Sequence, residues 1–172
     1  MRRLLPLLAA AALSLPLISA TGPEATAPTT HPASSEALAP KWMTWDEAVA
    51  AQKKNPKHML VDLYTDWCGW CKRMDATSWS DPEVAAYIDE HFYAVKFDAE
   101  SKAPVVYDGH TFEYERVGGR GVHQLASSLT DNRLTYPSVV YFTPKMERQM
   151  VSQGYKDAKG LLDELRRVVE GA

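Results

Sequence analysis

The sequence predicts an α/β domain with a mixed central sheet and helices on both faces of that sheet. Two observations support this prediction. From about residue 41, helical and strand patterns alternate, and strands separated by helices usually run parallel. The last two strand patterns instead follow one another through a short turn, which indicates an antiparallel pair at the end of the sheet.

The first elements of the domain have clear boundaries. Thr44 and Glu47 have the spacing of a capping box, so a helix is expected to begin there. It should end at Asn55-Pro56, because a residue before proline disfavours the helical conformation. The apolar run 59–64 contains a single acid and predicts a strand buried on both sides. A second helix is expected from residue 68 to about residue 79.

The following elements continue this alternation. Ser80 is the expected N-cap of a helix over 82–91, and a strand is expected over 92–97. Residues 138–142 predict another strand, which should pair with a strand over 149–152 through a turn near residue 144. A stripe of apolar residues then predicts the closing helix. Its members are Leu161, Leu162, Leu165, Val168 and Val169.

The segment 101–120 interrupts the alternation. Asp108-Gly109 is a favoured hairpin turn, and the alternation of apolar and polar residues around Phe112 predicts a short strand pair. The glycines at 118, 119 and 121 are expected to break the chain ahead of a short helix over 122–129. We treat Ser101 to Arg120 as an insert, which either shapes the choice of partner or only decorates the fold.

The first forty residues differ from the rest in composition. Residues 1–20 combine two arginines, a short apolar stretch interrupted by proline, and small residues at the end. This is the pattern of a secretory signal peptide cleaved after Ala20, and the alternative is an uncleaved membrane anchor. Residues 21–40 are rich in proline, alanine and threonine and predict a disordered linker. The folded domain is therefore expected over 41–172, in the periplasm or an equivalent exported location.

Charge and histidine spacing exclude other classes. The 172 residues carry a formal net charge of −3, and no basic cluster follows one face or helix. Nucleic acid is therefore not an expected partner, because binding it requires a concentrated positive surface. The histidines lack metal-ligand spacing, and two cysteines supply only half of the ligands of a structural zinc site. We expect a monomer without a metal site.

Cys68 and Cys71 are the only cysteines of the chain. A disulfide between them would enclose two residues, and closing so short a loop adds little stability. The predicted strand 59–64 runs into this pair and a helix follows, which places Cys68 at a helix N-terminus. Unpaired backbone N–H groups and the helix dipole favour a thiolate there. Cys68 is thus the expected attacking sulfur, and Cys71, one turn later, is the expected resolving sulfur.

The residues around this pair resemble those of thioredoxins. The shared features are the acid Asp62 in the buried strand, Trp67 directly before the CxxC pair, Lys72 after it, Lys96 in the strand 92–97, and Tyr136-Pro137 before the strand 138–142. The resemblance covers roughly 41–172 and looks strongest to exported thioredoxin-like proteins with a CGWC motif. It implies a thioredoxin fold with an extra N-terminal helix and an inserted hairpin before the cis-proline strand.

The resemblance also implies catalytic roles for two residues of the sheet. Asp62 is expected to accept the proton of Cys71 through water while that thiol attacks the mixed disulfide. Lys96 is expected to face Asp62 across the strands. The alternative is that Asp62 is only a strand carboxylate paired with Lys96.

Substrate-binding roles follow from the same resemblance. Pro137 is expected to be cis, which would leave the Tyr136 backbone free to bind a substrate strand; the alternative is an ordinary proline at a strand start. Trp67, Gly69 and Trp70 are expected to form the contact surface around the sulfurs, although either tryptophan could instead be a packed aromatic. Thioredoxins usually have Gly-Pro between the cysteines, so their redox potential does not transfer to the Gly-Trp pair of this chain.

These features predict a thiol–disulfide oxidoreductase that acts on protein thiols and disulfides. No cofactor is expected beyond the redox-active Cys68–Cys71 pair, but a redox partner must recycle it. For a reductant in an oxidising compartment, that partner would be a membrane electron donor. The resemblance favours a reductant or isomerase over an oxidant. Two alternatives remain: a copper(I)-handling protein that uses the two soft thiolates as ligands, and a redox-inert scaffold.

Overall fold

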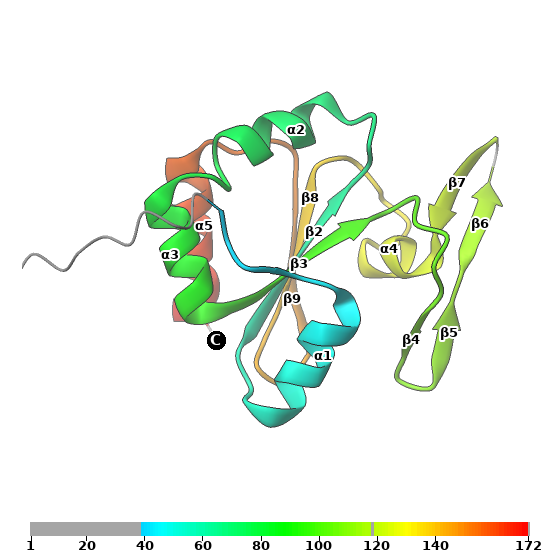
Figure 1. Ribbon diagram of the computed structural model, residues 1–172, viewed down its shortest axis with the longest axis horizontal. Coiled ribbons are helices and arrows are strands. Elements are labelled where there is room, and N and C mark those ends of the chain that lie inside the picture. Colours follow the sequence, from blue (N-terminus) through cyan, green and yellow to red (C-terminus); the bar gives the residue numbers. More distant parts are fainter. Residues whose placement is uncertain (1–38, 118, 172) are drawn as a thin grey trace, which may run out of the picture. The chain divides into compact units, whose positions relative to one another are not determined.

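A five-stranded mixed sheet forms the centre of the domain (Figure 1). The computed structural model describes residues 39–117 and 119–171, so the predicted signal peptide and nearly all of the predicted linker lie outside the described residues. The strand order is β1-β3-β2-β8-β9. These strands are β1 (Trp42–Met43), β2 (His58–Tyr64), β3 (Phe92–Asp98), β8 (Ser138–Phe142) and β9 (Arg148–Gln153). The central strand β2 pairs in parallel with β3 and antiparallel with β8, which confirms the predicted mixed sheet.

Helices cover both faces of this sheet. They are α1 (Trp45–Lys54), α2 (Gly69–Ala76), α3 (Pro82–His91), α4 (Gln124–Leu129) and α5 (Ala158–Glu170). Side chains of α1 and α4 share one core cluster with the sheet, and side chains of α2, α3 and α5 share the other. In Figure 1, α3 and α5 accordingly lie on one side of the strands and α4 on the opposite side. None of the helices within the described residues is both long and apolar enough to cross a membrane.

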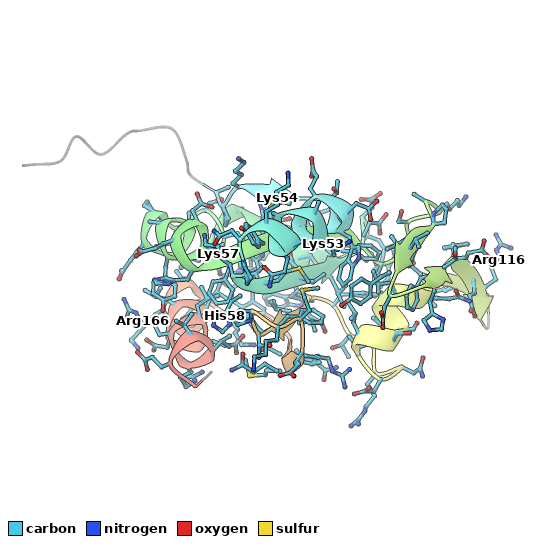
Figure 2. All side chains as sticks on the ribbon, turned by 90° about the horizontal axis from the view of Figure 1, so that it is seen from below. Lys53, Lys54, Lys57, His58, Arg116 and Arg166 are labelled. Atoms are coloured by element: carbon cyan, nitrogen blue, oxygen red, sulfur yellow. A yellow bond between two sulfur atoms is a disulfide. The ribbon has the colours of Figure 1, made fainter. Side chains whose placement is uncertain are left out.

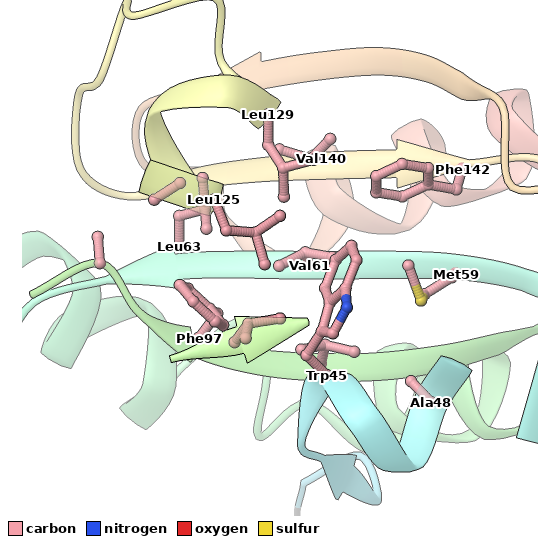
Figure 3. Close-up of a cluster of buried hydrophobic side chains, with 14 residues drawn as sticks. Trp45, Ala48, Met59, Val61, Leu63, Phe97, Leu125, Leu129, Val140 and Phe142 are labelled. Atoms are coloured by element: carbon pink, nitrogen blue, oxygen red, sulfur yellow. The ribbon is translucent and has the colours of Figure 1, made fainter. Parts of the chain in front are cut away.

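The first core cluster lies between the sheet and the helices α1 and α4 (Figure 3). Alternate residues of β2, such as Val61 and Leu63, point into it because successive side chains of a strand face opposite ways. Trp45 enters from α1 and Leu125 from α4, and all four side chains are almost completely buried. Each such side chain contributes roughly 1.5–3 kcal/mol through burial.

The second core cluster fills the opposite face. Leu60 of β2 points into it, together with Met74 of α2, Ile88 of α3 and Leu165 of α5, and each of these is fully buried. The predicted apolar stripe of the closing helix faces this cluster. Met74 therefore packs helix α2, which carries the cysteines at its N-terminal end, against the sheet.

The helix boundaries confirm one predicted cap and correct another. Thr44 and Glu47 form the predicted capping box, and Asn55 is the C-cap of α1. The N-cap of α3 is Asp81 and not Ser80, because the Asp81 carboxylate accepts hydrogen bonds from two backbone N–H groups of the first turn. Ser80 instead donates its hydroxyl to the carbonyl of Asp75. Helix α2 is also shorter than predicted, ending at Ala76.

In the structure the insert extends to His123 and consists of two hairpins. The first pairs β4 (Val105–Tyr107) with β5 (His110–Phe112) across the predicted turn at Asp108-Gly109, where both residues have positive φ. The second pairs β6 (Tyr114–Val117) with β7 (Arg120–His123). The expected helix start at residue 122 was wrong, since Gly121, Val122 and His123 belong to β7 and α4 begins at Gln124. Gly121 leaves room for the Tyr114 ring, because a Cβ atom at this position would lie 1.7 Å from the Tyr114 hydroxyl and the ring would have to move.

Candidate active site

Cys68 and Cys71 form a disulfide at the N-terminal end of α2. Cys68 is the N-cap of this helix, and its Sγ accepts a hydrogen bond from the backbone N–H of Cys71 at 3.1 Å. The same donor would stabilise a thiolate at Cys68 after reduction, as would the helix dipole. The two cysteines are 4% and 3% exposed, so solvent access does not distinguish them. The helix position does, and it favours Cys68 as the nucleophile.

Asp62 and Lys96 lie side by side in the sheet. They are directly paired residues of β2 and β3, and the Lys96 Nζ lies 2.6 Å from the Asp62 Oδ2. Burial raises the pKa of the Asp62 carboxyl from 3.8 to about 6, against the opposing effect of the Lys96 charge. Among the described residues, the second oxygen, Oδ1, accepts no hydrogen bond, although the nearby Trp79 side chain also lowers the pKa of the carboxyl. Asp62 can therefore change its protonation state near neutral pH with one oxygen uncommitted.

Asp75 is a third member of this charged group, and the sequence reasoning missed it. Its carboxylate contacts the Lys96 Nζ from helix α2, so Lys96 bridges a sheet acid and a helix acid. Burial alone would lower the pKa of Lys96, but the charges and hydrogen bonds of Asp62 and Asp75 raise it. The lysine therefore stays charged. The signal was present in the sequence, because Asp75 follows Cys71 by four residues and so lies on the same helix face.

Aromatic rings surround Lys96 on its open side. The Nζ lies 5.0 Å from the ring centroid of Trp42 and 5.0 Å from that of Tyr64. Trp42 belongs to β1, a two-residue strand that the sequence analysis did not predict. Such cation–π contacts shield the ammonium group from water without neutralising it.

Trp67 and Trp70 are exposed on either side of the cysteines. They are 53% and 56% exposed, so neither is a packed core aromatic. The Trp67 ring meets the Tyr136 ring edge to face at 5.7 Å, and the Trp70 ring lies 5.4 Å from that of Tyr155. Gly69 lies between them, and a Cβ there would meet no atom within 4 Å. Two large apolar surfaces thus frame the disulfide, an arrangement suited to contact with another protein.

Tyr136-Pro137 has the cis peptide bond that the resemblance implied. Pro137 is buried and directly precedes β8. Burial raises the pKa of Tyr136 to about 12, with smaller contributions from nearby carboxylates, so its phenol stays neutral. Because the Tyr136 ring contacts Trp67, this segment lies next to the first cysteine.

Comparison with known families decides the classification. The family model described as "Thioredox_DsbH: Protein of unknown function, DUF255" matches residues 33–170. The chain belongs to this family. No curated protein sequence matches this chain.

Solved structures show the same fold. A thioredoxin from Thermus thermophilus is 19% identical to this family member, with a TM-score of 0.57, covering 76% of this chain and 88% of that one. A DsbH oxidoreductase is 16% identical, with a TM-score of 0.56 and coverage of 88% and 95%. A putative disulphide isomerase from Bacteroides thetaiotaomicron is 24% identical, with a TM-score of 0.55 and coverage of 79% and 96%. These similarities confirm the thioredoxin fold for this DsbH-like chain.

Proposed function

We propose that this protein is a thiol–disulfide oxidoreductase that acts on other proteins outside the cytoplasm, mainly as a reductant or isomerase. The observation that carries the proposal is the Cys68–Cys71 disulfide at the start of α2, with Cys68 as the N-cap. A structural disulfide would gain little from enclosing two residues. A reactive pair gains directly from the helix N-terminus, because thiolate stability sets its reactivity. Membership of the DsbH-like family agrees with this chemistry.

The reaction begins with the reduced pair. The Cys68 thiolate attacks one sulfur of a substrate disulfide, a new bond forms between the two proteins, and the other substrate sulfur leaves as a thiolate that takes up a proton. The Cys71 thiol then loses its proton and attacks the Cys68 sulfur. This step closes the Cys68–Cys71 disulfide and releases the second substrate thiol. Two electrons pass to the substrate, and a redox partner must return two electrons to the pair.

Asp62 is the proposed acceptor of the Cys71 proton. The carboxyl is buried, and Lys96 connects it to Asp75 on helix α2, the helix that carries Cys71. Its pKa of about 6 suits proton transfer near neutral pH. Lys96 holds the carboxyl in place through Oδ2 and keeps its pKa from rising further. Trp67, Gly69, Trp70, Tyr136 and Pro137 are the proposed contact surface for the substrate.

The equilibrium redox potential of the pair tests the direction. The protein spanning 41–172 is equilibrated with glutathione at graded ratios, and the fraction of disulfide is measured by mass spectrometry after trapping. A value near or below about −230 mV supports a reductant, which then needs a membrane electron donor. A value near or above about −150 mV makes the protein an oxidant and overturns the proposed direction.

The activity itself is tested by reduction of insulin with dithiothreitol as electron source. Acceleration by the wild type and none by a Cys68→Ser variant supports the proposal. Tight binding of one equivalent of copper(I), with no acceleration of insulin reduction, would instead support the copper-handling alternative. The absence of both insulin reduction and copper(I) binding in the wild type would favour a redox-inert scaffold.

A further inference from the structure

A pocket beside the disulfide has one wall from the thioredoxin-like core and one from the insert. Its volume is about 390 Å³. Trp67, Leu134 and Tyr136 line it from the core, and Arg120 and Val122 line it from strand β7. Trp67 lines the pocket and directly precedes Cys68, so the pocket adjoins the chain segment that carries the proposed attacking sulfur. A substrate side chain near the reactive cysteine would therefore meet this pocket.

Arg120 is the charged group that the insert brings to this pocket. Its guanidinium carbon lies 4.8 Å from the centroid of the Trp67 ring. The indole N–H of Trp67 in turn donates to the Glu100 carboxylate at 3.1 Å. The tryptophan is thus held from two sides, and the guanidinium is positioned over its exposed face. Stacking of this kind fixes the plane of an arginine while leaving its N–H donors available.

Those donors have no acceptor in the part of the chain that the structure describes. Within residues 39–117 and 119–171, the Arg120 side chain makes no ion pair and donates no hydrogen bond. Glu100 also lines the pocket, but its carboxylate already accepts from the indole. A ligand that displaces water from the guanidinium must supply an acceptor, because an arginine left without one pays a desolvation cost. A carboxylate supplies two acceptor oxygens in the matching geometry.

We propose that Arg120 is a specificity residue, which favours substrate proteins with an acidic side chain close to the cysteine that Cys68 attacks. This inference rests on the proposed function. The insert would then take part in substrate selection, because β7 places the Arg120 guanidinium over the ring of Trp67. The exposed carboxylate of Asp66 and that of Glu100 oppose the effect, so the expected preference is moderate.

Arg116 offers a matched control on the same hairpin. It is exposed like Arg120, but it pairs with Gly121, whereas Arg120 pairs with the neighbouring residue of β6. Since side chains alternate between faces along a strand, Arg116 and Arg120 point to opposite faces of the hairpin. Figure 2 shows Arg116 at the outer end of the insert. Reversal of either charge changes the net charge of the protein equally, and only Arg120 adjoins the pocket.

The test uses three disulfide-linked peptides that differ in one residue beside the cysteine, which is Glu, Gln or Lys. The second-order rate constant for their reduction by the dithiol form of the protein is divided by the rate with dithiothreitol, which corrects for intrinsic reactivity. The wild type should reduce the Glu peptide about threefold faster than the Lys peptide, the size expected for one exposed ion pair. The preference should disappear at about 0.5 M salt, where such pairs are screened.

The variants decide the assignment. Arg120→Glu should invert the order of the peptides, Arg116→Glu should keep the wild-type order, and Glu100→Gln should increase the preference for the Glu peptide. Equal rates for all three peptides, or the same change in both arginine variants, would overturn the inference while leaving the proposed function intact. Reduction of none of the peptides by the wild type would overturn the proposed function and the inference together.

Discussion

The sheet and the insert contribute to the same site in opposite ways. The sheet supplies Asp62 and Lys96, two charged groups that are directly paired and largely shielded from water. The insert supplies Arg120, a charged group that is exposed and has no partner among the described residues. A buried charge that must change its protonation state requires a rigid frame, whereas an exposed charge is free to meet different partners. We therefore propose that the sheet supports proton transfer at the cysteines and that the insert supplies the recognition of substrates.

Substitution of the cysteines is expected to have the largest effect on activity, because the sheet and the insert both act through them. Cys68→Ser should abolish disulfide reduction, a loss on the order of 10³-fold or more, because no other thiolate lies at the helix N-terminus. Cys71→Ser should retain attack and accumulate a mixed disulfide with the substrate. Mass spectrometry of the trapped complex measures this. Trapping by the Cys68→Ser variant and none by the Cys71→Ser variant would show that the roles of the two cysteines are reversed.

Removal of the Asp62 carboxylate tests the sheet side of the comparison. Asp62→Asn should slow the release of the mixed disulfide by about 10²-fold at pH 7, the usual range for a lost proton acceptor. In the wild type the release rate should rise with pH as Asp62 ionises, around its pKa of about 6, and the variant should lose this dependence. Single-turnover stopped-flow fluorescence of Trp67 and Trp70 measures the step. An unchanged pH profile would exclude Asp62 as the acceptor.

The stability of the oxidised protein gives an independent readout of the same residue. The pKa of Asp62 is higher in the folded protein than its ordinary value of 3.8. Relative to asparagine, Asp62 therefore favours folding most below about pH 4, and this contribution is lost as the pH rises through about 6. Urea unfolding should show Asp62→Asn gaining stability over the wild type across this range, by on the order of 2–3 kcal/mol at pH 7. A constant difference between pH 4 and pH 7 would contradict the raised pKa.

His123 tests the junction between the two regions. Its Nδ1 accepts the backbone N–H of Leu125, so its Nε2 carries the proton and donates to the carbonyl of Ala103 at 3.0 Å. Replacement of His123 by leucine should cost about 2 kcal/mol, because two hydrogen bonds of the buried side chain are lost. Burial lowers the pKa of His123, so its contribution to stability is present above about pH 6.5 and is lost as the pH falls.

This dependence has the opposite sign to that of Asp62, and urea unfolding of the two variants across pH 4–7 separates them. His58 provides a control histidine, because it lies at the start of β2, away from the insert. Burial lowers the pKa of His58 as well. The wild type minus His123→Leu difference should shrink at low pH. A difference that grows at low pH would show that His123 is charged in the folded protein.

Shortening the second hairpin should have the smallest effect on the chemistry. Tyr114 and His123 are directly paired, so Asn-Gly in place of residues 115–122 joins them by a two-residue turn and removes Arg120. Reduction of a small disulfide such as glutathione should stay within about twofold of the wild type, because Asp62 and Lys96 are untouched. In a Cys71→Ser background, the set of trapped substrate proteins should change. An unchanged set would refute a role of the insert in recognition.

The sequence predicted the frame of the site because its signals are local. A buried acid in an apolar run, a capping box and a CxxC pair between strand and helix are each readable within a few residues, and the pairing of Asp62 with Lys96 followed from the family resemblance. The contribution of Asp75 was missed, although the four-residue spacing from Cys71 indicated it. Trp42 had no such signal, because its position over Lys96 depends on the pairing of β1 with β3.

The insert was less predictable for a physical reason. Its first hairpin has a favoured turn dipeptide and was recognised, whereas the second hairpin turns among glycines that are equally compatible with an irregular loop. The stacking of Arg120 on Trp67 joins residues that are far apart in sequence, and no periodic pattern encodes such a contact. Sequence reasoning therefore located the sulfurs and Asp62, the proposed proton acceptor, but not the cation that stacks on Trp67.

The two ends of the insert meet at a single hydrogen bond, from the backbone N–H of His123 to the carbonyl of Ala99 at 2.7 Å. The first hairpin of the insert packs back against the domain, because Val105 is buried in the first core cluster and the Tyr107 ring lies 5.1 Å from the Trp45 ring. Of residues 115–122 in the second hairpin, those that the structure describes contribute no member to either core cluster. Since the entropic cost of closing a loop grows only slowly with its length, a longer or shorter segment between Tyr114 and His123 would leave the central strands in place. Replacement of this second hairpin alone would therefore present a different surface to substrates while the core and the redox pair keep their positions.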